Sequence, residues 1–546
     1  MAPLMGRMMS MPLMISSLIV HAARHAGDTE IVSRRGEGDT HRYTWADAEV
    51  RSRRLAQALS RLGLRPGDRV GTLAWNGYRH LEAYYGVSGS GLVCHTINPR
   101  LFPEQVAWIV TDAQDRALCF DLSFLPLVEK LHEELGSVEH FVLMTERAHM
   151  PAHTSIPRLK CYEELIEAEN GDYRWPEFDE NTASSICYTS GTTGNPKGAI
   201  YSHRSTLIHA LASVQPDAMG LSACDVALPI VPMFHVNAWG IPYSAALVGC
   251  KLVLPGARLD GESLHELFEQ ERVTFSAGVP TVWLGLLNHL KEQGRTFGSL
   301  KRTLIGGSAC PPAMMRALQA EHGLEVLHGW GMTELSPLGT VSRLKAKHLE
   351  LPVDQQRLVL QKQGKVLFGI DMEIVDEDGQ PLPWDGHRAG NLVVRGPWVI
   401  SGYFGCEESP LLPLPGRGDW FPTGDVATID GDAYMQITDR SKDVIKSGGE
   451  WISSIELENV AMSHPGVQEA AAVAARHPKW DERPLLVVVK RPGSTLTRDE
   501  LIAFYEGRIA KWQVPDDVVF VAELPHTATG KIQKLKLRQQ FENHLD

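Results

Sequence analysis

The sequence predicts a large α/β protein that ends in a small α+β unit, and three observations carry this prediction. Apolar strand segments alternate with helical segments from residue 68 to about residue 340, which predicts parallel sheets covered by helices. After residue 360, short alternating strands are joined by Gly/Asp turns, which predicts an antiparallel β unit. A charged boundary at 439–443 then precedes a compact segment that is long enough for an independent domain.

Length and composition restrict the class of protein. A chain of 546 residues is too long for one hydrophobic core, so several domains are expected. Its 43% hydrophobic and 22% charged residues are typical of a soluble globular protein. The net charge of −13 argues against a nucleic-acid-binding surface, which needs clustered Lys and Arg. The 8 cysteines occur singly and form no C-x-x-C pair, which disfavours zinc or a disulfide framework and favours buried thiols in a reducing compartment.

The N-terminal segment has two interpretations. Arg7 precedes an apolar run at 11–20 that loosely resembles a signal peptide. The alternative, which we favour, is an amphipathic helix with Ile15, Leu18 and Ala22 on one face and Gly27 as its end. No apolar run reaches the roughly 18 residues that a membrane span needs, so we expect a cytoplasmic protein without a membrane span.

The first third of the chain sets the alternating pattern. Thr44 and Asp47 form a helix-start signal, and the apolar face of that helix ends at Gly63. The segments that follow are a strand at 68–75, a turn at 76–77, a helix near 78–90, a strand ending at Pro99, a helix at 103–112 and a strand at 116–121. Because ligands of such folds bind at the carboxyl ends of strands, the loops after strands are the places to search.

The rest of the chain continues this pattern and then changes it. The next expected segments are strands at 183–190 and 199–204, a helix at 205–214, a strand–loop–helix unit at 225–240, strands at 251–256, 274–280 and 303–309, and a strand with a Gly-rich turn at 325–338. The antiparallel unit occupies 368–380, 390–397 and 425–439. The last unit has segments at 467–475 and 484–493, a helix from a capping box at Thr497 and Glu500 to Trp512, a strand at 518–525 and an exposed turn at 526–534.

One stretch, Tyr188 to Gly198, has the chemistry of a polyphosphate site. Its 11 residues hold 5 hydroxyls, 3 glycines and 1 lysine. Glycines let backbone N–H groups turn toward an anion, and hydroxyls and a cation add to its binding. It is not the usual P-loop, because Pro196 stands where that motif needs glycine. The other interpretation is a flexible linker. The candidate residues are Thr189, Ser190, Gly191, Thr192, Thr193, Gly194 and Lys197.

Three further stretches are suited to a nucleotide, although each alone is also consistent with a tight turn. The segment His328-Gly329-Trp330-Gly331-Met332-Thr333-Glu334 has glycines for close backbone approach, an aromatic residue to flank a base, and a carboxylate suited to Mg²⁺. Asp425 in T-G-D can accept hydrogen bonds from ribose hydroxyls. Gly306, Gly307 and Ser308 at a strand end would let a flat base lie against the backbone.

Lys531 follows Gly530 on the loop before the last helix. A charge on such a loop is usually only solvated. If the loop brings it to a phosphate, the attraction at about 4 Å and an effective dielectric near 20 is about 4 kcal/mol. That is worth roughly three decades in rate.

Together these motifs resemble the AMP-forming adenylating superfamily, which contains acyl-CoA synthetases, luciferases and peptide-synthetase adenylation domains. The motifs that carry the resemblance, in the family's order, are YTSGTTGNPKG, GWGMTE, TGD, DRSKDVIKSGGEWIS and GKIQK. The resemblance implies a large N-terminal domain, residues 1–438, of two α/β subdomains plus a β-barrel. It also implies a mobile α+β C-terminal domain, residues 439–546, with its hinge at Asp439.

The resemblance further implies two half-reactions, in which a carboxylate attacks the α-phosphate of ATP and the CoA thiol then attacks the acyl-AMP. Thr189 and Glu334 match Mg²⁺ positions, Asp425 and Arg440 match ribose contacts, and Lys531 matches the adenylation lysine. The expected nucleotide contacts also include Gly307, Ser308, His328, Gly329, Trp330, Gly331, Met332, Thr333 and Lys446. The expected CoA contacts are Lys446, Gly448, Gly449, Glu450 and Trp451.

The acid substrate depends on the stretch Phe234 to Gly240. Amino-acid-activating members have Asp directly after this Phe, whereas this chain has His235, which favours an uncharged acyl tail. We expect His235 and Trp239, four residues apart at a helix start, to share one face. The predicted acyl pocket is His235, Val236, Asn237, Trp239 and Gly306, and the predicted catalytic residues are Lys531, Glu334 and His235.

Within the superfamily, the N-terminal stretch, FHVNAWG and GKIQKLKLR resemble bacterial ligases of medium-chain fatty acids, and most of all ligases of 3-methylmercaptopropionate. We therefore expect an acid–CoA ligase for a short to medium apolar acid, with that thioether acid first and plain fatty acids second. An enzyme that loads a carrier protein and a non-catalytic nucleotide-binding paralogue are the other hypotheses. A homodimer is expected from the resemblance alone.

Overall fold

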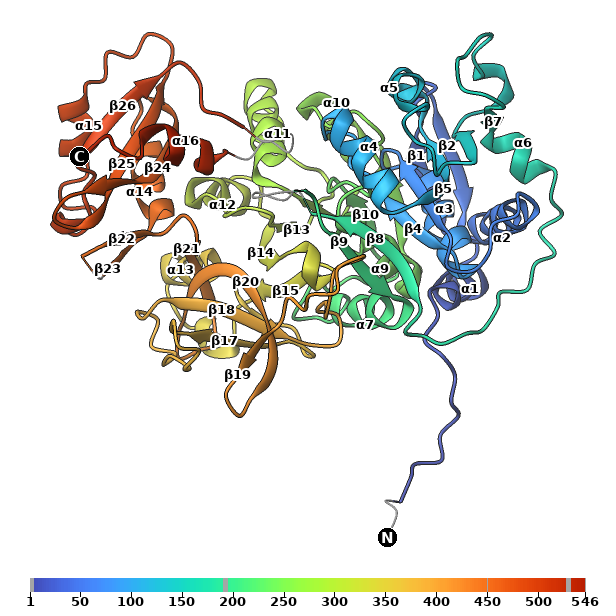
Figure 1. Cartoon of the computed structure of the whole chain (residues 1–546), viewed down its shortest axis with the longest axis horizontal. Helices are drawn as coiled ribbons and strands as arrows, with labels where there is room; N and C mark the ends of the chain where they lie inside the picture. Colours follow the sequence, from blue (N-terminus) through green and yellow to red (C-terminus); the bar gives the residue numbers. More distant parts are fainter. Residues whose placement is uncertain (1–3, 190–194, 449, 527–531, 546) are drawn as a thin grey trace. The chain divides into compact units, whose positions relative to one another are not determined.

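The computed structural model describes residues 4–189, 195–448, 450–526 and 532–545. These fall into two compact units, one of residues up to 371 together with 396–410, the other of 372–395 and the chain from 411 on. Figure 1 shows the chain coloured from its N-terminus to its C-terminus.

The first sheet of unit 1 has seven strands in the order β7-β6-β5-β3-β4-β8-β9. Its strands are β3 (Arg69–Leu73), β4 (Val93–Thr96), β5 (Asp115–Phe120), β6 (His140–Leu143), β7 (Lys160–Cys161), β8 (Ala183–Tyr188) and β9 (Gly198–Ser202). All neighbours are parallel except the β8–β9 pair. The sheet therefore has the parallel character that the alternating pattern predicted.

The second sheet of unit 1 has nine strands in the order β16-β15-β14-β13-β12-β10-β11-β1-β2. Its strands are β1 (Glu30–Arg34), β2 (Thr40–Thr44), β10 (Val226–Pro229), β11 (Lys251–Leu254), β12 (Phe275–Gly278), β13 (Arg302–Ile305), β14 (Glu325–Gly331), β15 (Leu338–Ser342) and β16 (Lys365–Val366). The strands from β14 to β1 are parallel, and the pairs at both edges are antiparallel.

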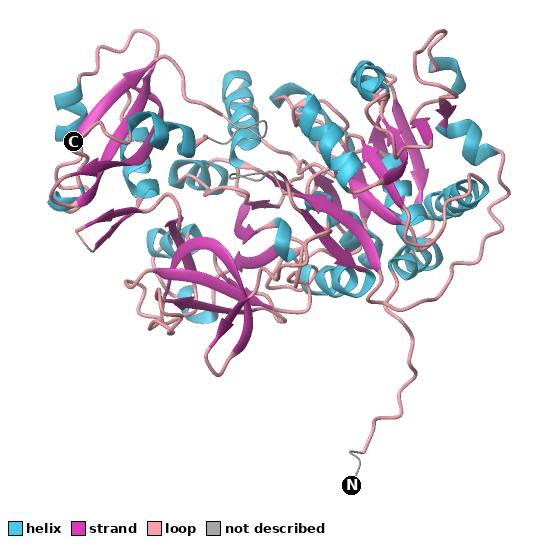
Figure 2. Ribbon diagram, in the orientation of Figure 1, coloured by secondary structure: helices cyan, strands magenta, loops and turns pink. Residues whose placement is uncertain are grey.

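Helices lie along the faces of these sheets (Figure 2). They are α1 (Ile15–His25), α2 (Trp45–Arg61), α3 (Tyr78–Gly89), α4 (Pro103–Asp112), α5 (Leu125–Leu131), α6 (Tyr162–Glu167), α7 (His203–Ser213), α8 (Val236–Trp239), α9 (Ile241–Val248), α10 (Gly261–Glu271), α11 (Pro280–Gln293), α12 (Pro312–Ala320) and α13 (Val353–Gln361). The predicted N-terminal helix is confirmed, and α2 begins at the predicted capping box of Thr44 and Asp47. Every residue of α3 is buried, so this helix is part of the core.

Unit 2 contains two five-stranded sheets. The first, where the resemblance implies a β-barrel, is β17 (Asp371–Val375), β18 (Gly390–Arg395), β19 (Leu412–Leu414), β20 (Gly418–Ile429) and β21 (Met435–Arg440). The second is β22 (Ile445–Ser447), β23 (Glu450–Ile452), β24 (Val467–His477), β25 (Asp481–Lys490) and β26 (Asp517–Val521), accompanied by α14 (Ser454–Met462), α15 (Arg498–Phe504) and α16 (Lys534–Phe541). The expected helix to Trp512 is wrong, because the chain turns through Gly507 at a φ of 74°.

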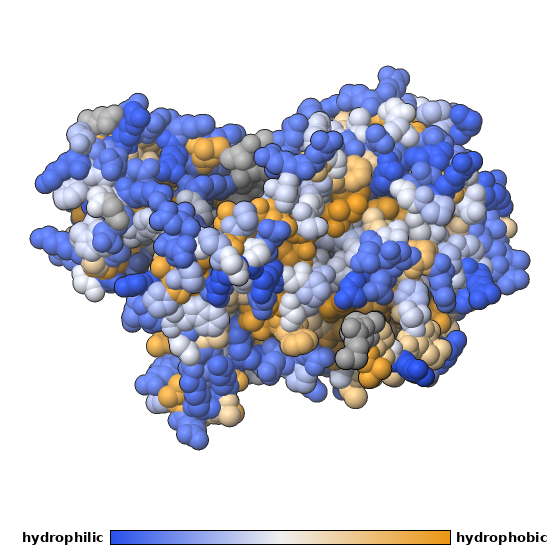
Figure 3. All heavy atoms as spheres, turned by 60° about the horizontal axis from the view of Figure 1, so that its bottom comes forward, coloured by the Kyte–Doolittle hydropathy of each residue, from blue (hydrophilic) through white to orange (hydrophobic). Residues whose placement is uncertain are grey.

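The face of the molecule in Figure 3 is mostly hydrophilic, with hydrophobic side chains between the polar ones. Among the described residues, no helix combines the length and the apolar character that crossing a bilayer requires.

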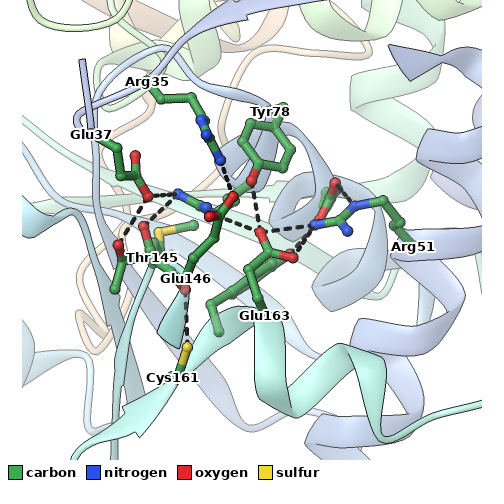
Figure 4. Close-up of polar contacts among 12 residues, drawn as sticks. Arg35, Glu37, Arg51, Tyr78, Thr145, Glu146, Cys161 and Glu163 are labelled. Carbon is green, nitrogen blue, oxygen red and sulfur yellow. Dashed lines mark hydrogen bonds and ion pairs between the residues drawn. The ribbon is translucent and has the colours of Figure 1, made fainter. Parts of the chain in front are cut away.

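A buried network of charges connects four elements of unit 1 (Figure 4). Glu163 on α6 accepts hydrogen bonds from Arg51 on α2 at 2.9 Å and from Arg79 on α3 at 2.7 Å, and the Tyr78 hydroxyl donates to it at 2.7 Å. Arg79 also donates to Glu37 in the β1–β2 turn at 2.7 Å. Burial alone would raise the pKa of Glu163, but the two guanidinium charges lower it overall.

The Glu163→Gln substitution tests this network. Removing one partner of a buried charge network costs about 3–5 kcal/mol of stability, because the remaining charges stay buried. The adjacent Glu164→Gln is a matched control, since Glu164 pairs with Arg147 at the surface, with side chains 45% and 85% exposed. That control is expected to change stability by at most about 1 kcal/mol.

Urea and thermal unfolding of the full chain measure both substitutions. Because the folded-state pKa of Glu163 is lowered, its stabilisation is fully present above the ordinary glutamate pKa and is lost as pH falls through the lowered value. The difference between the two variants should therefore shrink in acid. Equal losses at neutral pH would contradict the network's contribution.

Candidate active site

The predicted phosphate stretch lies on the β8–β9 hairpin. Tyr188 at the end of β8 pairs with Gly198 at the start of β9. The backbone N–H of Thr189 donates to the carbonyl of Lys197 at 2.9 Å, and the Lys197 N–H donates to the Thr189 hydroxyl at 3.4 Å. The predicted residues Ser190, Gly191, Thr192, Thr193 and Gly194 lie outside the described residues. The two flanking residues are thus held together at the carboxyl end of a parallel strand, where ligands of such folds bind.

The predicted nucleotide stretch from His328 to Glu334 is not a turn that follows a strand. Strand β14 continues through both of its glycines and ends at Gly331. Gly331 is needed for a close approach, since a Cβ there would lie 2.1 Å from the Pro337 carbonyl oxygen. The Met332 N–H donates to that same oxygen at 3.0 Å. A short 3-10 turn, Thr333–Leu335, then places Glu334, which is 8% exposed.

His328 and Trp330 support the site from within the protein. His328 is 1% exposed, and its Nε2 accepts the Cys310 N–H at 3.2 Å while its Nδ1 lies 2.8 Å from the Gln361 carbonyl oxygen. Burial lowers the pKa of His328 to about 4, so the ring is neutral. Through Cys310 it holds the segment that follows Gly306, Gly307 and Ser308. The Trp330 ring packs against Gly339, and the residue is 6% exposed.

Tyr403 connects the two predicted stretches, and the sequence did not single it out. Its hydroxyl donates to Oε1 of Glu334 at 2.8 Å, and Nζ of Lys197 lies 5.2 Å from its ring centroid, a cation–π distance. The backbone N–H of Phe404 donates to the Gly198 carbonyl at 2.8 Å. Burial and the Glu334 charge raise the pKa of Tyr403, so it remains a hydroxyl donor. The sequence signal that could have indicated Tyr403 is the pair of aromatic residues between two glycines, G-Y-F-G.

The predicted acyl stretch has an unusual backbone. Val236, Asn237, Ala238 and Trp239 have φ values of 47°, 52°, 50° and 55°, so α8 is a left-handed turn. The helix start on which His235 and Trp239 were expected to share one face is thus a left-handed turn, and His235 precedes it with an extended backbone. Left-handed backbone costs about 1–2 kcal/mol for each non-glycine residue, so surrounding contacts must hold this turn.

The turn brings Trp239, predicted in the acyl pocket, close to Gly306 and Gly307, which are predicted to lie against the base. Carbons of the Trp239 indole lie 3.2 Å and 3.7 Å from where Cβ atoms of Gly306 and Gly307 would be. A Cβ at Gly306 would also lie 2.9 Å from the Gly329 carbonyl oxygen. Val236 is buried, and His235 is half-buried. Asn237, which is also predicted in the acyl pocket, forms hydrogen bonds to side chains of β8.

In unit 2 the predicted ribose contacts lie opposite each other on β20 and β21. Asp425 is 1% exposed, and its Oδ1 lies 2.9 Å from Nε of Arg440. The Asp425 N–H donates to the Thr423 hydroxyl at 3.1 Å. Asp439, which precedes Arg440 in the sequence, is buried. Its carboxylate accepts a hydrogen bond from the Ser454 hydroxyl at 2.9 Å. Burial raises the pKa of Asp439.

The predicted CoA contacts that the structure describes lie on the β22–β23 hairpin of unit 2. Nζ of Lys446 lies 5.8 Å from the Trp451 ring centroid and 3.0 Å from a carboxylate oxygen of Glu377. Gly448 has a φ of 60°, and Glu450 is exposed. Gly449 and the predicted catalytic Lys531 lie outside the described residues.

Known proteins resemble this chain along nearly its whole length. The AMP-binding enzyme family model matches residues 19–404, and the model for the AMP-binding enzyme C-terminal domain matches residues 456–531. The chain is 55% identical over 542 residues to a 3-methylmercaptopropionyl-CoA ligase of Ruegeria lacuscaerulensis, covering 99% of this chain and 100% of that one. It is 51% identical over 538 residues to a medium-chain-fatty-acid–CoA ligase of Ectopseudomonas oleovorans, covering 98% of each.

The fold also resembles a solved structure. The crystal structure of the anthranilate CoA ligase AuaEII in complex with anthranoyl-AMP matches with a TM-score of 0.83 at 24% identity, covering 98% of each chain. This similarity supports the fold, a large N-terminal part of α/β sheets with a smaller C-terminal part.

The Tyr403→Phe substitution tests the link between Lys197 and Glu334. It removes the hydrogen bond to the carboxylate and keeps the ring beside Lys197. A hydrogen bond to a charged group contributes about 1.5–3 kcal/mol, which is the upper limit of the binding energy lost, so the Kd for Mg-ATP should rise by up to about a hundredfold. Calorimetric titration with a non-hydrolysable ATP analogue measures it. Tyr173→Phe, on a loop beside Trp175, is the control, and an unchanged Kd for Tyr403→Phe would contradict the role of this link.

Proposed function

The chain belongs to the AMP-binding enzyme family, and from this premise we propose that it is an ATP-dependent acid–CoA ligase whose acid is 3-(methylthio)propanoate. The observation that carries the proposal is the end-to-end similarity to the 3-methylmercaptopropionyl-CoA ligase. The similarity to a medium-chain-fatty-acid ligase makes a plain short or medium-chain acid the alternative. The reaction forms acyl-CoA through an acyl-AMP, with release of pyrophosphate and then AMP.

In the first half-reaction the acid carboxylate attacks the α-phosphate of ATP. The chain's contribution is positioning and charge stabilisation. Lys197, held at the base of the phosphate stretch and beside Tyr403, supplies a cation for the departing pyrophosphate. Lys531 supplies a second cation, which we assign to the α-phosphate.

Thr189 and Glu334 fit a Mg²⁺ ion. Mg²⁺ needs only one or two protein oxygens when phosphates and waters complete its shell. Glu334 offers a carboxylate that Tyr403 orients, and Thr189 offers a hydroxyl at the end of β8. When bound, the ion would neutralise charge on the phosphate oxygens.

Asp425 and Arg440 are assigned to the ribose. The Arg440 guanidinium lies beside the Asp425 carboxylate, and a carboxylate is a group that can accept hydrogen bonds from two vicinal hydroxyls. We assign the base to Gly306, Gly307, Ser308 and the 328–333 segment. These assignments follow the family's motif order.

For the second half-reaction we propose two domains, residues 1–438 and 439–546, with the hinge at Asp439. Rotation there would withdraw Lys531 and present Lys446, Gly448, Gly449, Glu450 and Trp451 to CoA. Such a step is of the kind that limits turnover in many enzymes. The left-handed Gly448 and the exposed Glu450 support a hairpin tip that can meet a ligand.

The apolar side chains of the predicted acyl stretch support an uncharged tail. Phe234 and Val236 are buried apolar side chains, and Phe234 packs edge-on against Trp75 with ring centroids 5.7 Å apart. His235 takes the position where amino-acid-activating members carry Asp. We also propose a cytoplasmic homodimer on the family resemblance, which sedimentation of the purified chain would test.

An acid panel tests the substrate. AMP release that depends on CoA is measured with C2–C10 straight-chain acids and with 3-(methylthio)propanoate. We expect kcat/KM to be highest for the thioether acid. If butyrate or hexanoate exceeds it tenfold, the alternative acid class is correct, and if no acid gives CoA-dependent turnover, the ligase activity itself is refuted.

Lys531→Ala tests the adenylation lysine. Losing a cation beside the reacting phosphate removes about 4 kcal/mol of charge stabilisation at an effective dielectric near 20, or roughly three decades in rate. Acyl-AMP formation should therefore collapse, whereas thioester formation from added acyl-AMP should persist. Lys536→Ala, on α16, is the control. Equal loss in both half-reactions would contradict the assignment.

A further inference from the structure

Asn237 points from the left-handed turn toward the seven-stranded sheet. Its side-chain amide donates to the Ser185 hydroxyl at 3.1 Å, and the Cys187 thiol donates to its carboxamide oxygen at 3.4 Å. Both partners lie on β8, and Asn237 is 4% exposed. The side chain therefore fastens the turn to the strand that leads to Thr189.

A second asparagine holds the segment before the turn. The Asn76 side-chain amide donates to the carbonyls of Pro229 and Val231, each at 2.9 Å, and its oxygen accepts the Met233 N–H at 2.6 Å. The Tyr84 hydroxyl donates to the Met233 carbonyl. The connection from β10 to the turn is thus fixed by side chains from the α3 region, and Asn237 continues that fixation into the turn itself through its hydrogen bonds to β8.

The turn needs such fixation because its residues disfavour its backbone. Val236 is β-branched and Trp239 is bulky, and both have positive φ. Without contacts that over-determine it, this conformation would relax. Relaxation would move the Trp239 indole away from Gly306 and Gly307, against which it now packs.

We propose that Asn237 is a positioning residue for acid recognition, because it holds the left-handed turn on β8 and thereby keeps the Trp239 indole against Gly306 and Gly307. The inference rests on the proposed ligase activity. With the indole fixed, the space for the acid's tail has a fixed end, so the enzyme discriminates among acids by length. With the indole released, this discrimination falls.

Asparagine can stabilise the turn through its backbone preference or through its side-chain hydrogen bonds. Substitutions separate these two effects. Asn tolerates positive φ better than most residues, which is a backbone effect. Asn237→Gly keeps that freedom and removes the two side-chain hydrogen bonds. Asn237→Ala removes the hydrogen bonds and also disfavours the backbone. Arg158→Gly is a matched control, since Arg158 also has a positive φ of 53° but is exposed on a loop before β7.

The experiment measures kcat and KM across the straight-chain acids and 3-(methylthio)propanoate for each purified variant. For Asn237→Gly we expect KM for the acid preferred by the wild type to rise at least tenfold. The ratio of kcat/KM between that acid and the longest acid turned over should fall at least fivefold. For Arg158→Gly, the KM for the preferred acid and the ratio of kcat/KM should both stay within twofold of the wild-type values. An unchanged ratio for Asn237→Gly, whatever the loss in overall rate, overturns the proposal, because a merely structural role lowers all acids alike.

A double-mutant cycle tests whether Asn237 acts through Trp239. In a Trp239→Ala background, Asn237→Gly should change the ratio by less than twofold, and additive effects would overturn the proposal. Should Asn237→Gly not fold, Ser185→Ala removes the hydrogen-bond acceptor on β8 and should lower the same ratio by a smaller factor. No change with Ser185→Ala would then count against the proposal.

These outcomes are distinct from failure of the proposed function. If the wild type turns over no acid with CoA, the function and this inference fall together. If the wild type turns over acids and the variants keep its length preference, only the inference falls.

Discussion

The hydrogen bond from the Tyr403 hydroxyl to Glu334 is the contact on which the unit 1 site depends. It joins the return segment 396–410 to the end of β14 in the nine-stranded sheet. The same segment binds the other sheet, because the Phe404 N–H donates to Gly198 on β9. A cation and a carboxylate from two different sheets, Lys197 and Glu334, are thereby held on either side of one phenol. A magnesium polyphosphate needs both a cation and a carboxylate, and this phenol contacts one of each.

The predicted acyl stretch depends on a different constraint, the left-handed turn at Val236–Trp239. Strained backbone persists only where neighbours over-determine it, and here polar side chains from α3's region and β8 do so. The consequence is spatial, because the turn presses Trp239 onto the glycines at the end of β13.

Sequence reasoning located most elements because their signals are local. The capping box at Thr44 and the proline at Pro103 mark the starts of α2 and α4. The turn after His235 was missed because apolar spacing reports a helical period but not the sign of φ. Tyr403 was missed because its role comes from contacts with Glu334 and Lys197, far away in sequence. Asp425 and Arg440 were paired by motif, and the β20–β21 register places them opposite each other.

The central claim is that the acid's carboxylate attacks the α-phosphate of ATP. The most direct measurement uses an acid carrying ¹⁸O in both carboxylate oxygens, with mass spectrometry of all products after CoA-dependent turnover. Attack on the α-phosphate leaves one carboxylate oxygen on phosphorus when the thiol displaces AMP, so AMP should contain one ¹⁸O and pyrophosphate none. Label in inorganic phosphate, with ADP as the nucleotide product, would show attack at the γ-phosphate and contradict the account.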